Sequence, residues 1–60
     1  MTHIINNYDF ELDSKFNIHI CETRNNKRKY LDMIAATSTL TKDEFIYKCK
    51  QWYAKNVLFI

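Results

Sequence analysis

The sequence contains no glycine and no proline among its 60 residues. At average usage a chain of this length holds about four glycines and about three prolines, so its turns and helix ends must be made by other residues. Phosphate-binding glycine loops, dinucleotide-binding fingerprints and nucleophile elbows all require glycine, and the sequence therefore excludes them. We expect short polar residues to reverse the chain instead, at Asp13-Ser14-Lys15 and at Asn25-Asn26.

Two alternating segments predict the first two strands. Residues 8–13 alternate apolar with acidic side chains, and residues 16–21 keep their apolar side chains on even numbers. A three-residue loop at 13–15 would place Leu12 opposite Phe16 and Phe10 opposite Ile18, with all four on one face. Residues 1–7 are expected to lie outside the sheet.

The segment 27–36 is the least determined part of the chain. A turn centred on Asn25-Asn26 would pair Ile20 with Leu31 and Ile18 with Met33, which favours a third strand. The same residues are good helix formers, so a helix over 27–36 remains an alternative.

The end of the chain predicts an amphipathic helix. Thr41 and Glu44 have the spacing of a capping box, and a helix over 42–55 would end at Asn56 in the left-handed conformation. Its apolar positions recur at helical spacing. They are Phe45, Ile46, Cys49, Trp52 and Tyr53.

These elements predict one α+β domain over residues 1–60. A three-stranded antiparallel β-meander is followed by one C-terminal amphipathic α-helix packed on one face of the sheet. On the other face, which we call the open face, the predicted register aligns Asp9, His19 and Asp32 in one row. The spacing of histidine and cysteine gives no metal-site or catalytic motif, so we expect no metal, no cofactor and no enzymatic activity.

The charges are divided unevenly along the chain. Residues 1–22 hold four acidic residues and one basic residue, whereas residues 23–60 hold eight basic and three acidic residues. An acidic open face with an exposed tyrosine fits a basic protein surface, to which it would be drawn electrostatically. The predicted partner-binding residues are Asp9, Glu11, Asp13, Tyr30, Asp32 and Ile34.

The small size and the Lys/Asn/Ile-rich composition resemble small phage-encoded proteins that inhibit host enzymes or antiviral defence systems. This resemblance implies a non-enzymatic inhibitor that blocks a larger host protein, such as an antiviral-defence or nucleic-acid-processing enzyme.

A small DNA-binding or transcription-regulatory protein is the alternative. The predicted order of three strands and a helix resembles the arm-type domain of tyrosine recombinases and the plant AP2-type domain, which lay the open sheet face in the DNA major groove. The acidic residues of the first strand oppose such binding. The basic residues available for it are Arg24, Lys27, Arg28, Lys29, Lys48, Lys50 and Lys55.

Location and assembly are predicted from the two chain ends and the cysteines. The first residues lack the pattern of a secretory signal, no apolar run is long enough to span a membrane, and Cys21 and Cys49 are expected to stay unpaired. We therefore expect the cytoplasm of the host cell and no membrane contact. The apolar tail 57–60 needs a covering surface, which favours a homodimer.

Overall fold

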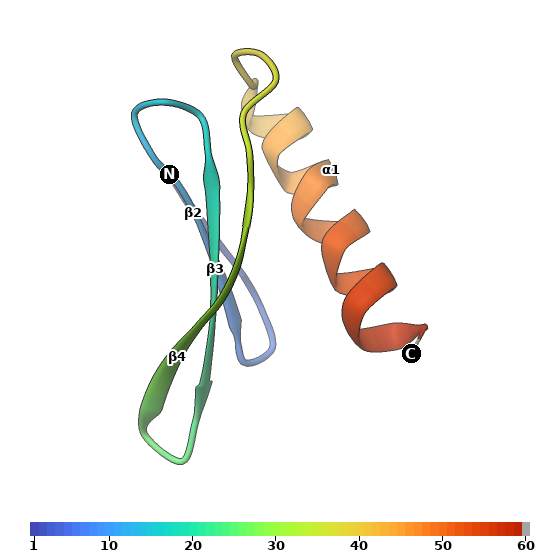
Figure 1. Cartoon of the computed structure of the whole chain (residues 1–60). Coiled ribbons are helices and arrows are strands. Elements are labelled where there is room, and N and C mark those ends of the chain that lie inside the picture. The colour runs from blue at the N-terminus through green and yellow to red at the C-terminus, as the bar shows by residue number, and fades with distance from the viewer. Residues whose placement is uncertain (60) are drawn as a thin grey trace.

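Four strands and one helix, extended by a π-helical turn, make up the described part of the chain, residues 1–59, in the computed structural model (Figure 1). The strands form one antiparallel sheet in chain order. The predicted α+β class and the C-terminal helix are confirmed, but the sheet has four strands and not the predicted three. The elements are β1 (Thr2–Ile5), β2 (Tyr8–Leu12), β3 (Ile18–Arg24), β4 (Lys27–Ile34), α1 (Lys42–Tyr53) and the π-helical turn η1 (Ala54–Leu58).

The additional strand is β1, in a segment that we expected to lie outside the sheet. Ile4 lies opposite Asp9, and Ile5 lies opposite Tyr8 across a two-residue connection. The connection is Asn6-Asn7, in which Asn6 has a φ of 52°. The same dipeptide at Asn25-Asn26 joins β3 to β4, with φ values of 54° and 63°. Both hairpins thus use asparagine where glycine is the common choice.

The loop between β2 and β3 is longer than predicted. Phe10 lies opposite Ile20, so the predicted pair of Phe10 with Ile18 is wrong. The cause is Asp13, whose Oδ1 accepts backbone N–H bonds from Lys15 at 2.8 Å and from Asn17 at 2.9 Å. With these bonds the five residues 13–17 form the loop and are not paired with another strand. Because the register moves by two residues, each side chain keeps its predicted face.

The segment 27–34 is a strand, as favoured, and the turn at Asn25-Asn26 is confirmed. Its register is broken by a β-bulge, because Cys21 lies opposite Tyr30 while Ile20 lies opposite Asp32. The extra residue is Leu31, which reverses the faces of the residues that follow it. The predicted pairs of Ile20 with Leu31 and of Ile18 with Met33 are therefore wrong.

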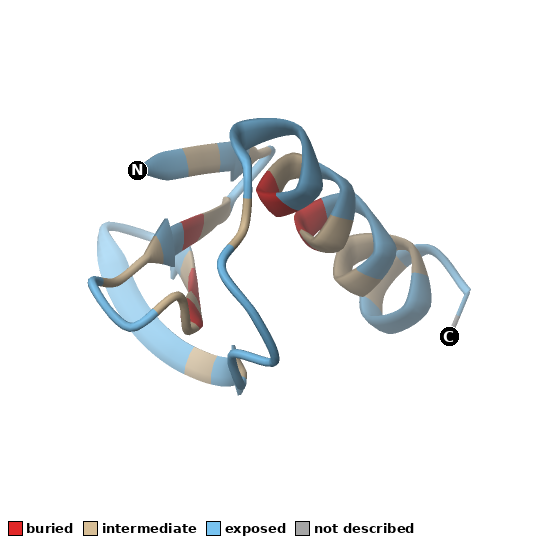
Figure 2. Ribbon diagram, turned by 90° about the horizontal axis from the view of Figure 1, so that it is seen from above, coloured by how far each residue is buried: buried red, intermediate tan, exposed pale blue. Residues whose placement is uncertain are grey.

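The core lies between the centre of the sheet and one side of α1 (Figure 2). Trp52, in the last turn of α1, packs against this core: the centroid of its ring lies 6.0 Å from that of Tyr8 and 5.8 Å from that of Phe10. Burial of these large side chains supplies most of the stabilisation available to so short a chain. The fully buried side chains are Phe10, Ile18, Ile20, Phe45 and Cys49.

The predicted start of α1 is confirmed and its predicted end is wrong. Glu44 N–H donates to Thr41 Oγ1 at 3.2 Å, and Thr41 N–H donates to Glu44 Oε1 at 2.9 Å. At the other end Asn56 does not take a positive φ. The chain widens into η1, closed by a 3.0 Å bond from Phe59 N–H to the Ala54 carbonyl, and Asn56 Nδ2 donates to the Trp52 carbonyl at 2.9 Å.

The Thr41→Ala variant tests the capping box. We expect the free energy of unfolding to fall by about 1 kcal/mol, because the variant leaves a backbone N–H of the first turn without its acceptor. Urea denaturation followed by circular dichroism measures the loss. Thr39→Ala, at an exposed threonine just before the helix, is the matched control. Equal losses in both variants would contradict the role of the cap.

No helix within residues 1–59 combines the length and the apolar character needed to cross a membrane.

Candidate functional site

The candidate site is the open face, the side of the sheet turned away from α1 (Figure 1). Strand alternation and the observed registers assign the side chains to it. The open face carries Thr2, Ile4, Asp9, Glu11, His19, Cys21, Thr23, Arg28, Tyr30 and Met33.

A chain of hydrogen bonds runs through His19 on the open face. Its Nε2 lies 2.7 Å from Asp13 Oδ2, and its Nδ1 lies 2.7 Å from Tyr30 Oη. The His19 bond, together with the backbone N–H groups of the loop, lowers the pKa of Asp13 to about 2. An ionised carboxylate can only accept, so Nε2 donates to Asp13, and Nδ1 is hydrogen-bonded to the Tyr30 hydroxyl. The chain thereby fixes the tyrosine side chain.

The predicted row of Asp9, His19 and Asp32 is wrong. Asp9 lies opposite Cys21, because the longer loop moves the register of β2 against β3 by two residues. The same loop brings Asp13 to His19 in its place.

Most of the predicted acidic charge on the open face is compensated within the chain. Arg28 donates to Asp9 at 2.6 Å, and this hydrogen bond raises the pKa of Arg28. Asp13 is bonded to His19. Glu11 is exposed and has no hydrogen-bond or ion-pair partner among residues 1–59. The open face is therefore mixed in charge.

Large apolar side chains are exposed on the open face. The exposed fractions are 67% for Ile4, 56% for Tyr30 and 44% for Met33. A shallow depression of about 470 Å³ lies beside Ile4, and Asp9 and Arg28 are also among its lining residues. The sequence analysis did not place Ile4 and Met33 on this face, because it predicted neither β1 nor the bulge in β4. The pair Asn6-Asn7, which repeats the Asn25-Asn26 turn, was the available signal for β1.

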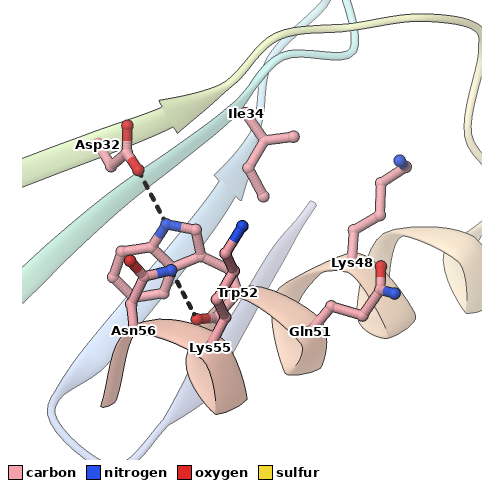
Figure 3. A pocket seen from close by; sticks show the side chains of 7 residues that line it. All are labelled: Asp32, Ile34, Lys48, Gln51, Trp52, Lys55 and Asn56. Carbon is pink, nitrogen blue, oxygen red and sulfur yellow. Dashed lines mark hydrogen bonds between the residues drawn. The ribbon is translucent and has the colours of Figure 1, made fainter. Parts of the chain in front are cut away.

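Two predicted partner-binding residues lie on the other side of the sheet. Because of the bulge, Asp32 and Ile34 face α1, and Ile34 packs against the core. Asp32 Oδ2 accepts a 2.9 Å hydrogen bond from Trp52 Nε1, which lowers the pKa of this carboxyl. The assignment of Asp32 and Ile34 to the open face is thus wrong. Both line a groove between β4 and α1 (Figure 3).

The basic residues of the DNA-binding alternative are divided between the two sides of the sheet. Arg24 is bonded to Glu22 at 2.7 Å, and Arg28 is on the open face. Lys48 and Lys55 line the groove between β4 and α1. Lys50 is turned about 160° away from Lys48 around the helix axis. The strand lysines are on the α1 side of β4, since Lys27 and Lys29 alternate with Arg28 and Tyr30.

The two cysteines are free, and they are buried on different sides of the sheet. Within residues 1–59 no group of three potential ligands has metal-site geometry.

Comparison with known proteins gives no match: no family model matches the sequence, and neither the curated proteins nor the solved structures show significant similarity to it.

The Asp13 carboxylate predicts a pH dependence of stability. Its pKa is about 2 in the folded chain against an ordinary value of 3.8. The unfolded chain therefore binds the proton first, and this stabilisation, complete above about pH 4, is lost as the pH falls toward 2.

We expect Asp13→Asn to reduce the slope of stability against pH in this window, measured by urea denaturation at several pH values. Asp32 and Glu44, whose pKa values are also lowered, supply the slope that remains. Glu11→Gln is the charge-matched control, and an unchanged slope in Asp13→Asn would contradict the bond to His19.

Proposed function

We propose that this chain is a non-enzymatic protein-binding module that blocks a larger protein by covering it with the open face. One observation carries the proposal: the open face exposes Tyr30 and Met33 on β4 and Ile4 on β1 at the other edge of the sheet, while α1 covers the opposite face. Exposed apolar side chains that share a face, with polar groups around them, are typical of protein interfaces.

Tyr30 is the proposed anchor of this interface. Its hydroxyl is bonded to His19, which is in turn bonded to Asp13, so the ring is ordered before a partner arrives. A preordered tyrosine loses little conformational entropy on binding and contributes a large contact area. Burying it in a pocket of the partner would make it a main source of binding energy.

The charges of the open face indicate the chemistry of the partner surface. Glu11 supplies an uncompensated negative charge, whereas the Asp9–Arg28 pair is neutral as a unit. We therefore propose that apolar contact supplies most of the affinity, and that one basic group of the partner meets Glu11. A nucleic-acid-processing or antiviral-defence enzyme of a host cell remains the proposed partner class. The cytoplasm is the proposed location, where free Cys21 and Cys49 would stay reduced.

The test is affinity capture from a bacterial lysate with three immobilised proteins. We expect the wild-type chain to retain a stoichiometric partner and the Tyr30→Ser/Met33→Ser variant to lose it. Tyr47→Ser removes an aromatic side chain that is equally exposed on the outer side of α1 and should retain the partner. Each variant is first shown to be folded by circular dichroism. Loss with Tyr47→Ser and retention with Tyr30→Ser/Met33→Ser would overturn the proposal.

We also propose that the chain forms a homodimer through its C-terminal tail. Leu58 and Phe59 are exposed by 61% and 80% in the single chain, and Ile60 lies outside the described residues. A second copy would remove this apolar surface from water. Sedimentation equilibrium should show a dimer at micromolar concentration and a monomer for Leu58→Ser/Phe59→Ser. A monomeric wild-type chain would contradict this assembly.

A further inference from the structure

A groove lies between β4 and the helical segment formed by the second half of α1 and η1, away from the open face (Figure 3). Its volume is about 430 Å³. The bulge at Leu31 creates the strand wall, because it turns Asp32 and Ile34 toward the helix. The lining residues are Asp32, Ile34, Lys48, Gln51, Trp52, Lys55 and Asn56.

The groove carries a net positive charge. Lys48 of α1 and Lys55 of η1 are about two helical turns apart, and their side chains extend on the side that faces β4 (Figure 3). Neither is in an ion pair among residues 1–59. Lys27 and Lys29 continue the same side of the sheet toward the hairpin tip. The one carboxylate of the lining, Asp32, stays ionised because the hydrogen bond from the indole N–H of Trp52 lowers its pKa, so two lysines and one carboxylate leave the lining with a net charge of +1.

The other polar and aromatic groups suit a nucleobase. The indole N–H of Trp52 donates a hydrogen bond to Asp32, and the ring packs against the rings of Tyr8 and Phe10. The Trp52 side chain is therefore ordered without a ligand. Aromatic rings of this kind stack on bases in single strands. Gln51 Nε2 donates to Tyr47 Oη at 3.2 Å and Asn56 Nδ2 donates to the Trp52 carbonyl at 2.9 Å, so the two amide oxygens are the groups left to accept hydrogen bonds from base edges.

We propose that this groove binds a short single-stranded nucleic acid. Lys48 and Lys55 contact successive phosphates, and a base stacks on Trp52. The groove and the open face lie on opposite sides of the sheet, so one chain can bind a nucleic-acid strand while its open face binds a protein. A single strand is favoured over an acidic peptide because the ordered indole and the Gln51 amide lie between Lys48 and Lys55 along the helix.

The binding test uses the fluorescence of Trp52, the single tryptophan of the chain. Titration with an oligothymidylate of about eight nucleotides should quench the emission in a saturable manner. Two phosphate contacts predict a slope of log K against log salt of about −1.4, or about −2.8 if Lys27 and Lys29 also take part. The affinity should then fall roughly 7- to 50-fold between about 50 and 200 mM salt. No saturable quenching at the lower salt concentration overturns the proposal.

Charge-matched variants separate the groove from general electrostatic attraction. We expect Lys48→Glu/Lys55→Glu to weaken binding by about tenfold or more and to flatten the salt dependence. Lys15→Glu/Lys50→Glu makes the same charge change outside the groove and should change the affinity by less than about threefold. If the acidic groove variant fails to fold, Lys48→Gln/Lys55→Gln replaces it. Equal losses in the groove and control variants overturn the proposal.

Competing ligands test the chemical class. A decaglutamate peptide or a duplex of the same length should bind at least about tenfold more weakly than the single strand. Equal or tighter binding of either one overturns the assignment to single-stranded nucleic acid. Tyr30→Ser/Met33→Ser should leave oligonucleotide binding unchanged, so failure of this proposal and failure of the proposed protein interface are distinguishable.

Discussion

Replacing Phe10 with alanine is expected to lower the free energy of unfolding by about 3–5 kcal/mol. Phe10, on β2, is fully buried between the sheet and α1, and its ring lies against Trp52. The variant would lose the transfer energy of the ring and would leave a cavity. A domain of this size has a total stability of roughly 3–9 kcal/mol, so the variant should be largely unfolded at 25 °C. Urea denaturation followed by Trp52 fluorescence measures the loss.

Phe16 is the matched phenylalanine outside the core. It is half-buried in the loop after β2 and has a φ of 64°, a left-handed conformation that costs a bulky residue about 1–2 kcal/mol. Phe16→Asn relieves this strain while losing some apolar contact, so we expect stability within about 1 kcal/mol of the wild type. Similar losses for Phe10→Ala and Phe16→Asn would contradict the observed register. Phe10→Leu, which conserves most of the volume, keeps the comparison measurable if Phe10→Ala does not fold.

The thiol of Cys49 is expected to react with a disulfide reagent at least about 1000-fold more slowly in the folded chain than in the unfolded chain. Burial against the core raises the pKa of this thiol to about 12, from an ordinary value of 9.0. The reactive thiolate is therefore about 1000 times scarcer near pH 8 in the folded state. By linkage, this group favours unfolding as the pH rises from about 9 toward 12.

The labelling experiment uses a Cys21→Ala background, so that Cys49 is the only thiol. Reaction near pH 8 is followed in buffer and in concentrated urea, where the unfolded chain supplies the reference rate. Adding Phe10→Ala to the same background should restore most of the reactivity, because it opens the core. A rate in buffer close to the rate in urea would contradict the packing of α1 on the sheet.

Local chemistry was enough to predict the helix and the turn at Asn25-Asn26. Thr41 and Glu44, three residues apart, each accept a hydrogen bond from the other's backbone N–H. Asn25 and Asn26 tolerate a positive φ because their side chains are short and polar. The apolar face of α1 followed from residue spacing alone. These predictions needed no knowledge of distant parts of the chain.

The candidate site was only partly predictable. Tyr30, Asp9 and Glu11 were assigned to the open face correctly, since alternation survives a register change of two residues. Asp32 and Ile34 were assigned to the wrong face because a single bulged residue reverses all side chains after it. The composition of the strand does not reveal which residue will bulge.

The amino-acid sequence by itself determined the α+β class, the helix and its start, the turn at Asn25-Asn26 and the alternation of the sheet, all of which arise from interactions within a few residues. Only the tertiary structure decided which polar groups meet. The bonds of His19 to Asp13 and Tyr30, and of Trp52 to Asp32, depend on a five-residue loop and a bulge. Those irregularities are set by packing and hydrogen bonding across the whole sheet, and together they form both the open face and the groove.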